Sequence, residues 1–409
     1  MHALRVAIAF TAAAVLSTAS AAAAPVPYPP VPADAQATAD ELAASLAAFR
    51  ASLPKRPPAR AKPPVVASEL LTANGNLGER LLDPAARVKN LVMLDALQRI
   101  GARGVGVDIP YPLLDPGYPR NEEYLAYYEQ VARDVRERGL TLMVESQVVF
   151  TNTPYSSLAI DYASMPLDEF LAGRTRQVVR IAREIRPDYL AFTTEQGTDQ
   201  MLTHQPVSTD RYVQFVDDTI AAVGDVKGVA LGAGSGNWEG SQLVDRLAAD
   251  PGVDFIDVHI YPLTVPGRNL LDAARSMVAT ARRHHKDAVI GEAWLYKASA
   301  AELARGVDFL SVIPRDSLAY WAPLDAEYVD TISRFARATG VSFVNFYWAQ
   351  YFFGYPALAA TSATDPAAAL AASSSAGAAA ILAKETTPAG EAFRRHASRR
   401  GSGRSSSAR

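Results

Sequence analysis

The sequence of 409 residues contains no cysteine, which excludes disulfide bonds and thiolate metal sites. Histidine is also scarce, with six in the whole chain, so a metal site built from several histidines is disfavoured. The 40 basic and 43 acidic residues nearly balance, and the net charge is −3. This composition gives no indication of a nucleic-acid partner or of binding to an anionic surface.

Hydrophobic runs are short everywhere except near the amino terminus. There the charged residue Arg5 is followed by an apolar run from Val6 to Leu16 and then by Ala19-Ser20-Ala21. This is the order of charge, apolar core and cleavage site in a secretory signal peptide, and the run is shorter than the roughly 20 residues of a membrane span. We therefore expect cleavage near Ala21, a secreted or periplasmic protein, and no stable membrane insertion by later segments.

Composition divides the rest of the chain into a central body with two atypical ends. Residues 22–63 are proline-rich and predict a linker with one short helix, on which Leu42, Leu46 and Phe49 share a face. Residues 356–409 form an alanine- and serine-rich segment and a basic tail, for which we expect disorder. The sequence thus predicts four parts: a signal peptide at 1–21, the linker, a single domain at 64–355, and the disordered end. We expect the domain to be a monomer.

Within residues 64–355, short β-branched or aromatic runs alternate with segments of helical periodicity, which predicts βαβ units and a parallel sheet. The expected strands are Val65–Leu70, Gly104–Ile109, Leu140–Val144, Tyr189–Thr194, Gly228–Leu231, Phe255–Ile260, Ala288–Gly291 and Val341–Trp348. Eight strands are the number that closes a (β/α)8 barrel, a TIM barrel of the α/β class. The rival fold, a doubly wound open sheet, usually has a glycine-rich phosphate turn after its first strand, and no such turn follows Leu70. The alternating Gly232, Gly234 and Gly236 are interpreted as a tight turn at a strand end.

Polar and aromatic residues gather where these strands end, which in a TIM barrel is the rim that carries reactive groups. In chain order they are Asp108, Tyr111, Glu145, Gln147, Thr194, Glu195, Asn237, Trp238, Glu239, His259, Tyr261, Glu292, Trp294, Asn345, Tyr347 and Trp348. Aromatic planes suit the apolar faces of sugar rings, while the polar groups can bond sugar hydroxyls. Two carboxylates on facing strands are what glycosidic cleavage requires, with no cofactor and no metal.

These residues resemble those of the clan A retaining glycoside hydrolases, which have (β/α)8 barrels. The strand-seven motif from Val289 to Trp294 is the most similar, and the likeness covers the whole predicted barrel. The resemblance implies that Glu292 is the nucleophile and Glu195 the acid/base. It also implies that Tyr261 hydrogen-bonds the nucleophile and that Trp348 forms the floor of the sugar subsite.

Two positions depart from the pattern of the clan. Thr194 stands where the clan usually has the asparagine that precedes the acid/base, and Asp108 occupies the region of its usual arginine. The remaining rim residues are then candidates for substrate contact: Asp108, Tyr111, Glu145, Gln147, Thr194, Asn237, Trp238, His259 and Trp294.

Two other functions use a similar rim. A metal-dependent barrel enzyme, similar to a sugar isomerase or a phosphoesterase, could hold magnesium or manganese with Glu145, Glu195, His259 and Glu292. A non-catalytic carbohydrate-binding barrel is the third possibility, because Thr194 departs from the catalytic pattern. The hypothesis that best fits the sequence is a secreted retaining glycoside hydrolase acting on a poly- or oligosaccharide.

Overall fold

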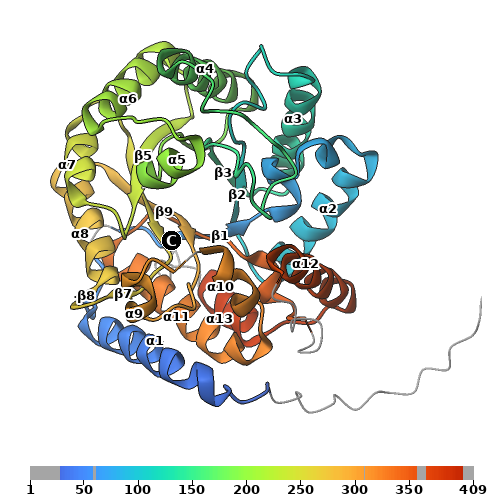
Figure 1. Cartoon of the computed structure of the whole chain (residues 1–409), viewed down its shortest axis with the longest axis vertical. Helices are drawn as coiled ribbons and strands as arrows, with labels where there is room; N and C mark the ends of the chain where they lie inside the picture. The colour runs from blue at the N-terminus through green and yellow to red at the C-terminus, as the bar shows by residue number, and fades with distance from the viewer. Residues whose placement is uncertain (1–27, 59–60, 308, 357–364, 399–409) are drawn as a thin grey trace, which may run out of the picture.

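The computed structural model describes residues 28–58, 61–307, 309–356 and 365–398. Eight parallel strands close into a barrel in the order β1-β10-β9-β6-β5-β4-β3-β2 (Figure 1). They are β1 (Val65–Glu69), β2 (Gly104–Asp108), β3 (Thr141–Glu145), β4 (Tyr189–Ala191), β5 (Ala230–Gly236), β6 (Phe255–Ile260), β9 (Asp287–Ala293) and β10 (Phe343–Phe346). The predicted (β/α)8 barrel is confirmed. The expected signal peptide lies outside the described residues.

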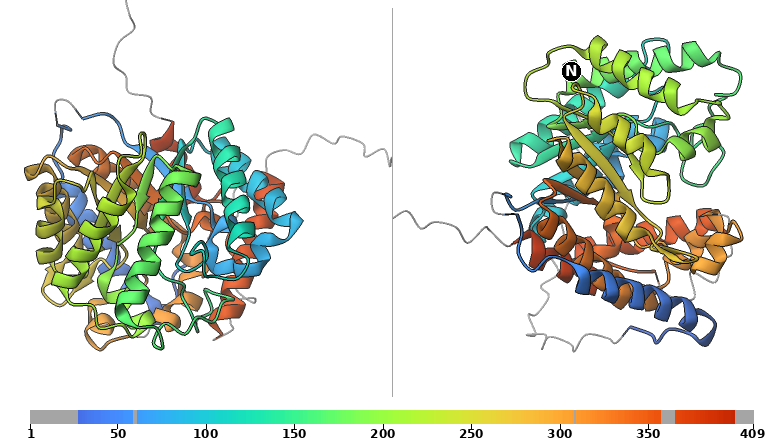
Figure 2. Two further views of the ribbon diagram at one scale, coloured as in Figure 1. Left: turned by 90° about the horizontal axis from the view of Figure 1, so that it is seen from above. Right: turned by 90° about the vertical axis from the view of Figure 1, so that its left-hand side faces the viewer.

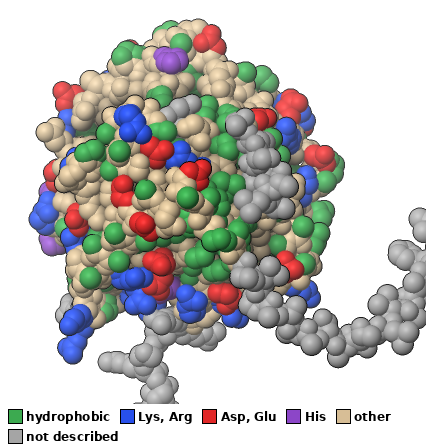
Figure 3. Space-filling view, turned by 60° about the horizontal axis from the view of Figure 1, so that its bottom comes forward, with side chains coloured by type: hydrophobic (Ala, Val, Ile, Leu, Met, Phe, Trp, Pro, Cys, Tyr) green, Lys and Arg blue, Asp and Glu red, His purple; other side chains and the backbone are tan. Residues whose placement is uncertain are grey.

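Helices surround the barrel on all sides, as Figures 1 and 2 show. Those that follow strands are α2 (Pro84–Arg99), α3 (Asn121–Glu137), α4 (Leu167–Arg180), α5 (Gln196–Thr203), α6 (Thr209–Val223), α7 (Ser241–Ala249), α8 (Leu270–Arg283), α9 (Ala300–Ala304), α10 (Phe309–Asp316) and α11 (Ala322–Thr339). Shorter pieces are η1 (Leu71–Ala73), η2 (Gly75–Leu82), η3 (Ile181–Ile185), η4 (Ala319–Trp321), η5 (Ala349–Phe352) and the hairpin of β7 (Thr264–Val265) with β8 (Arg268–Asn269). On the face in Figure 3, acidic and basic side chains are interspersed.

The barrel interior changes in character along its axis. Near the amino-terminal ends of the strands it is apolar, and the ring of Tyr189 packs edge-on against Phe255 at 5.4 Å between centroids and lies 5.5 Å from Phe343. Toward the carboxyl ends the inward-facing residues become polar, as at Asp257 and His259 on β6. The apolar end closes the barrel, so the polar end is the one available for chemistry.

Strand β5 corrects the expected turn at the alternating glycines, because Gly232, Gly234 and Gly236 lie within the strand. A Cβ atom at Gly232 would collide with the Phe255 ring, and one at Gly234 would collide with the main chain of Asp257. These glycines let β5 lie close to large inward residues of β6, which is a packing requirement of the barrel interior. The strand therefore ends at Gly236, five residues beyond Leu231, where the sequence predicted its end.

Both ends of the described chain pack on the barrel. The expected short helix is α1 (Ala33–Ser52), which lies along α11 with Phe49 against Phe335 at 5.3 Å (Figure 2). At the other end, α12 (Pro366–Ala383) and α13 (Pro388–Ala397) are helices, so the expected disorder does not hold for residues 366–397. Phe393 of α13 is fully buried against Phe352 at 4.7 Å, which explains the order.

Helix α12 is long and apolar enough to cross a membrane by length and composition, contrary to the expectation that later segments fall short of a span. Its apolar character comes mainly from alanine, and about a quarter of its most apolar stretch is buried in the protein. It contacts α10 and η5, so in this structure it serves as an outer helix of the fold.

Candidate active site

The imidazole of His259 lies between the two predicted catalytic carboxylates. Its Nδ1 atom is 2.7 Å from Glu195 Oε1 and 3.8 Å from Glu292 Oε2. Glu292 lies in β9 beside His259 in the neighbouring β6, while Glu195 follows β4 and immediately precedes α5. The two distances together limit the separation of these carboxylate oxygens to at most about 6.5 Å, a range that includes the roughly 5 to 5.5 Å typical of retaining enzymes.

Each oxygen of Glu292 accepts a hydrogen bond from a different side chain. The Tyr261 hydroxyl donates to Oε2 at 2.5 Å, and the Gln147 amide donates to Oε1 at 3.1 Å. Tyr261 lies two residues after His259, so both face the same side of the chain leaving β6. These two donors fix the orientation of the carboxylate and favour its ionised form.

Burial is the largest influence on Glu292, and it raises the pKa of this carboxyl well above its ordinary value. The charges of Glu145, Asp108 and Glu195 raise it further, while His259 opposes the shift. Without substrate, Glu292 and the neighbouring carboxyl groups therefore tend to retain a bound proton among them.

His259 is fully buried, and burial alone would lower its pKa. The surrounding carboxylates of Glu145, Glu292 and Asp257 outweigh burial and raise the pKa of His259 well above its ordinary value. The ring is then an imidazolium, so Nδ1–H donates to Glu195 while Nε2 faces Glu145 and Asp257, each at 3.4 Å. One cation thus links the acid/base to a deeper pair of carboxylates.

A layer of polar groups lies beneath the catalytic pair where TIM barrels usually hold branched apolar residues. Asp257 accepts a hydrogen bond from the main-chain nitrogen of Gly291 at 2.7 Å, and burial and the charge of Glu145 raise the pKa of Asp257 to about 6. A Cβ atom at Gly291 would collide with Glu145 and Asp257, so glycine just before the nucleophile makes room for them. Glu69 and Asn345 continue the layer through a 3.0 Å bond.

Half-exposed aromatic side chains form an arc above this layer. The aromatic arc consists of Trp238, Tyr261, Tyr347, Trp348 and Tyr155, with neighbouring rings 6.1, 6.4, 5.0 and 5.9 Å apart in that order. Because Tyr261 also donates to Glu292, the arc begins beside the two predicted catalytic carboxylates. Such a surface suits the apolar faces of sugar rings.

Glu239 binds the segment that directly follows Glu195 through hydrogen bonds. Its carboxylate accepts hydrogen bonds from the main-chain nitrogens of Gly197 at 2.5 Å and Gly236 at 3.1 Å, and from Ser235. Gly197 lies in the first turn of α5, so Glu239 caps the helix that begins just after Glu195. This contact gives Glu239 a positioning role.

Four predicted substrate contacts are buried side chains. Trp294 is buried between Tyr351 and Phe352, and Asn237 is buried with its amide donating to the main-chain oxygens of Pro262 and Leu270. The ring of Tyr111 packs against Tyr162 and Phe170. Thr194 directly precedes the acid/base, but its hydroxyl is buried and has no hydrogen-bond partner among the described residues.

Asn74 and Asp257 are members of the site that the sequence did not predict. Asn74 donates to Asp108 Oδ2 at 2.6 Å, beside the predicted rim residue Tyr347 at 3.1 Å, and Asn74 lies in a loop with no strand-end signal. Asp257 could have been found, because Asp257, His259 and Tyr261 alternate along β6 and therefore face the same side.

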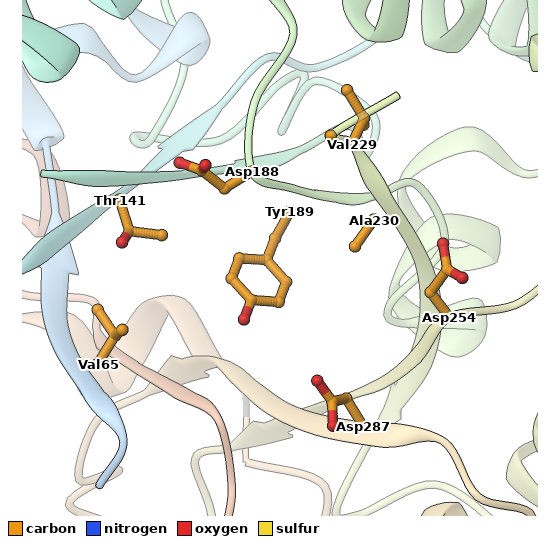
Figure 4. Close-up of a pocket in the computed structure, with 9 residues that line it drawn as sticks. Val65, Thr141, Asp188, Tyr189, Val229, Ala230, Asp254 and Asp287 are labelled. Carbon is orange, nitrogen blue, oxygen red and sulfur yellow. The ribbon is translucent and has the colours of Figure 1, made fainter. Parts of the chain in front are cut away.

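A hollow lies at the opposite mouth of the barrel, where the strands begin (Figure 4). It is lined by Tyr189 and by acidic residues at the starts of strands, among them Asp188 and Asp254. Their carboxylates accept main-chain hydrogen bonds from Leu142 and Leu231, each at 2.8 Å, which satisfies the ends of neighbouring strands. The predicted catalytic carboxylates, Glu195 and Glu292, lie at the other end.

Comparisons with known proteins agree on the fold. A GH5_18 protein from Bifidobacterium longum superimposes with a TM-score of 0.55 at 13% identity over 82% of this chain and 78% of that one. A variant of that protein in complex with Manβ1-4GlcNAc superimposes with a TM-score of 0.54 at 12% identity, over 82% of this chain and 78% of that one. An exo-β-1,4-mannosidase from an Opitutaceae bacterium superimposes with a TM-score of 0.51 at 14% identity, over 84% of this chain and 60% of that one.

The chain shares the (β/α)8 barrel fold with these proteins. No family model matches the sequence, and no curated protein shows significant sequence similarity to it.

Proposed function

We propose that the protein is a secreted glycoside hydrolase that cleaves a poly- or oligosaccharide with retention of configuration. One observation carries the proposal. Glu195 and Glu292 both approach the imidazole of His259 at the carboxyl ends of barrel strands, and their facing carboxylate oxygens lie within about 6.5 Å of each other. The expected signal peptide supports export. The clan A fold of the neighbours, two of them proteins acting on or holding mannose-containing sugars by name, supports a β-linked substrate.

In the first step, protonated Glu195 donates its proton to the glycosidic oxygen while ionised Glu292 attacks the anomeric carbon. His259 donates to Oε1 of Glu195, which leaves Oε2 as the oxygen that carries the transferable proton. In the second step Glu195 removes a proton from water, and that water releases the sugar from Glu292. Tyr261 and Gln147 hold the nucleophile in line throughout.

Substitution of each carboxylate tests the assignment. On a panel of β-linked mannans and glucans, Glu292→Gln and Glu195→Gln should each lower kcat by at least about a thousandfold while glycan binding persists. The product anomer of the wild type, followed by NMR during the first minutes, should have the configuration of the substrate. Wild-type turnover in Glu292→Gln, or an inverted product, would contradict the mechanism.

A metal-dependent reaction is the second candidate, since ligand atoms of Glu145, His259 and Glu292 lie within 4.8 Å of one another. Carboxylates and an imidazole suit magnesium, manganese or zinc. The hydrogen bonds that both carboxylate oxygens of Glu292 already accept favour the hydrolase. Loss of activity in a chelator and its return with manganese would instead support the metal enzyme.

A further inference from the structure

The site contains more acidic groups than two-carboxylate hydrolysis uses. Besides the catalytic pair, Asp108, Glu145 and Asp257 are all more than nine-tenths buried at the same end of the barrel. In the described part of the chain, His259 is the only cationic group among the main contributors to the pKa values of these carboxyls and of Glu292. Unpaired buried charge is costly, so this cluster favours a ligand or proton that neutralises it.

Asp108 is the member of the cluster that is best prepared to meet a ligand. Its Oδ2 atom accepts hydrogen bonds from Asn74 at 2.6 Å and Tyr347 at 3.1 Å, which fix the orientation of the carboxylate. Its Oδ1 atom has no hydrogen-bond partner among the described residues. Tyr347 belongs to the aromatic arc and packs against Tyr261, the residue that bonds Glu292. Asp108 therefore lies where a sugar held by the arc beside the nucleophile would reach it.

His259, whose charge lowers the pKa of Asp108, is shared among several other carboxylates. His259 already faces Glu195, Glu145, Asp257 and Glu292 within 3.8 Å. Burial and the charge of Glu145 raise the pKa of Asp108 to about 7, so the charged carboxylate is unfavourable without a counter-ion. An ammonium group would supply that counter-ion through a charge-assisted hydrogen bond, which a neutral hydroxyl or an acetamide does only weakly.

We propose that the sugar bound beside Glu292 carries a free, positively charged amino group, and that Asp108 is its counter-ion. This inference rests on the proposed hydrolase function and assigns its substrate class: a β-linked hexosamine glycan that is not N-acetylated. The preference arises from the charge on Asp108 together with the fixed geometry that Asn74 and Tyr347 give it.

The wild-type full-length protein tests this without any substitution. Values of kcat/KM are measured on β-linked oligosaccharides of glucosamine, N-acetylglucosamine and glucose, which differ only at carbon 2, with mannose oligosaccharides as a further neutral sugar. The amino sugar should be cleaved at least about tenfold more efficiently than each neutral one. Equal or faster cleavage of a neutral sugar would overturn the inference and leave the hydrolase function standing. Cleavage of none of them would contradict both.

Asp108→Asn removes the charge but keeps an oxygen that can accept from Asn74 and Tyr347. It should reduce the preference for the amino sugar at least about tenfold, mainly through a higher KM. Asp218→Asn, an equal loss of charge at an exposed position on α6, is the control and should keep the preference. An unchanged preference in a folded Asp108→Asn protein would overturn the assignment of Asp108.

Discussion

The hydroxyl of Tyr261 donates to Glu292, the nucleophile of the proposed mechanism. Tyr261→Phe should lower kcat/KM by roughly 10- to 100-fold, because a hydrogen bond to a charged group contributes about 1.5–3 kcal/mol. Steady-state kinetics on the best substrate measure the effect. Tyr118→Phe, which removes a hydroxyl from the loop after β2, is the matched control. A Tyr261→Phe enzyme as active as this control would exclude Tyr261 from the mechanism.

The raised pKa of Glu292 predicts how activity depends on pH. The nucleophile must be ionised, so activity falls as pH decreases through its pKa. Because burial and neighbouring carboxylates raise that pKa, the acidic limb of kcat/KM should lie above the roughly 4.3 of an ordinary glutamate. Glu145→Gln removes one of the negative charges and should move the limb to lower pH. A limb at or below the ordinary value in the wild type would contradict this description of the cluster.

Single residues were predictable where a strand end and a family pattern coincided. Glu292, Glu195, His259 and Tyr261 all end strands, and the structure brings them together. Asn74 was not predictable, because a loop residue shows its role only once the barrel brings it to Asp108.

At the scale of elements, α5 carries the acid/base at its amino terminus, and Glu239 holds that end to β5. Glu239→Ala should lower the free energy of unfolding by about 1–2 kcal/mol, the usual cost of a lost cap, and reduce kcat by displacing Glu195. Urea unfolding and kinetics measure the two effects. Glu239→Gln retains an acceptor oxygen and should recover most of both. Full activity in Glu239→Ala would show that the cap does not position the acid/base.

Elements were predictable in number and order from the alternation of β-branched and helical segments. Their boundaries were less so, as β5 shows. Glycines that break a strand in isolation can lie inside one when a neighbouring strand presents a large residue, here Phe255. That pairing is a tertiary property, which local sequence patterns do not contain.

At the scale of the whole molecule, the carboxyl-terminal helices belong to the packed fold. Phe393 of α13 contacts Phe346 and Phe352, so it closes one side of the barrel near β10. Phe393→Ala should lower the free energy of unfolding by about 3–5 kcal/mol through the lost contacts and the cavity left behind. Chemical denaturation measures the change, with the exposed Leu382→Ala as control. A loss no greater than that of the control would show that α13 is dispensable.

The barrel itself was predictable from the sequence, whereas the order of its carboxyl-terminal end was not. Alanine, serine and arginine in residues 366–397 have the composition of a disordered tail. A few large apolar residues, Phe393 and Ile381 among them, nevertheless bind this segment to the barrel surface. The overall composition of a segment does not reveal single buried residues of this kind.

The most direct test of the whole account is covalent trapping of the nucleophile. The protein is incubated with a panel of 5-fluoro β-glycosyl fluorides that retain the carbon-2 group of glucose, mannose or glucosamine and form the glycosyl-enzyme faster than it hydrolyses, and the labelled peptide is identified by mass spectrometry. We expect a single added sugar on Glu292 of the wild type and no label in Glu292→Gln. A sugar on any other residue, or an unlabelled wild type that hydrolyses the same glycosides, would contradict it.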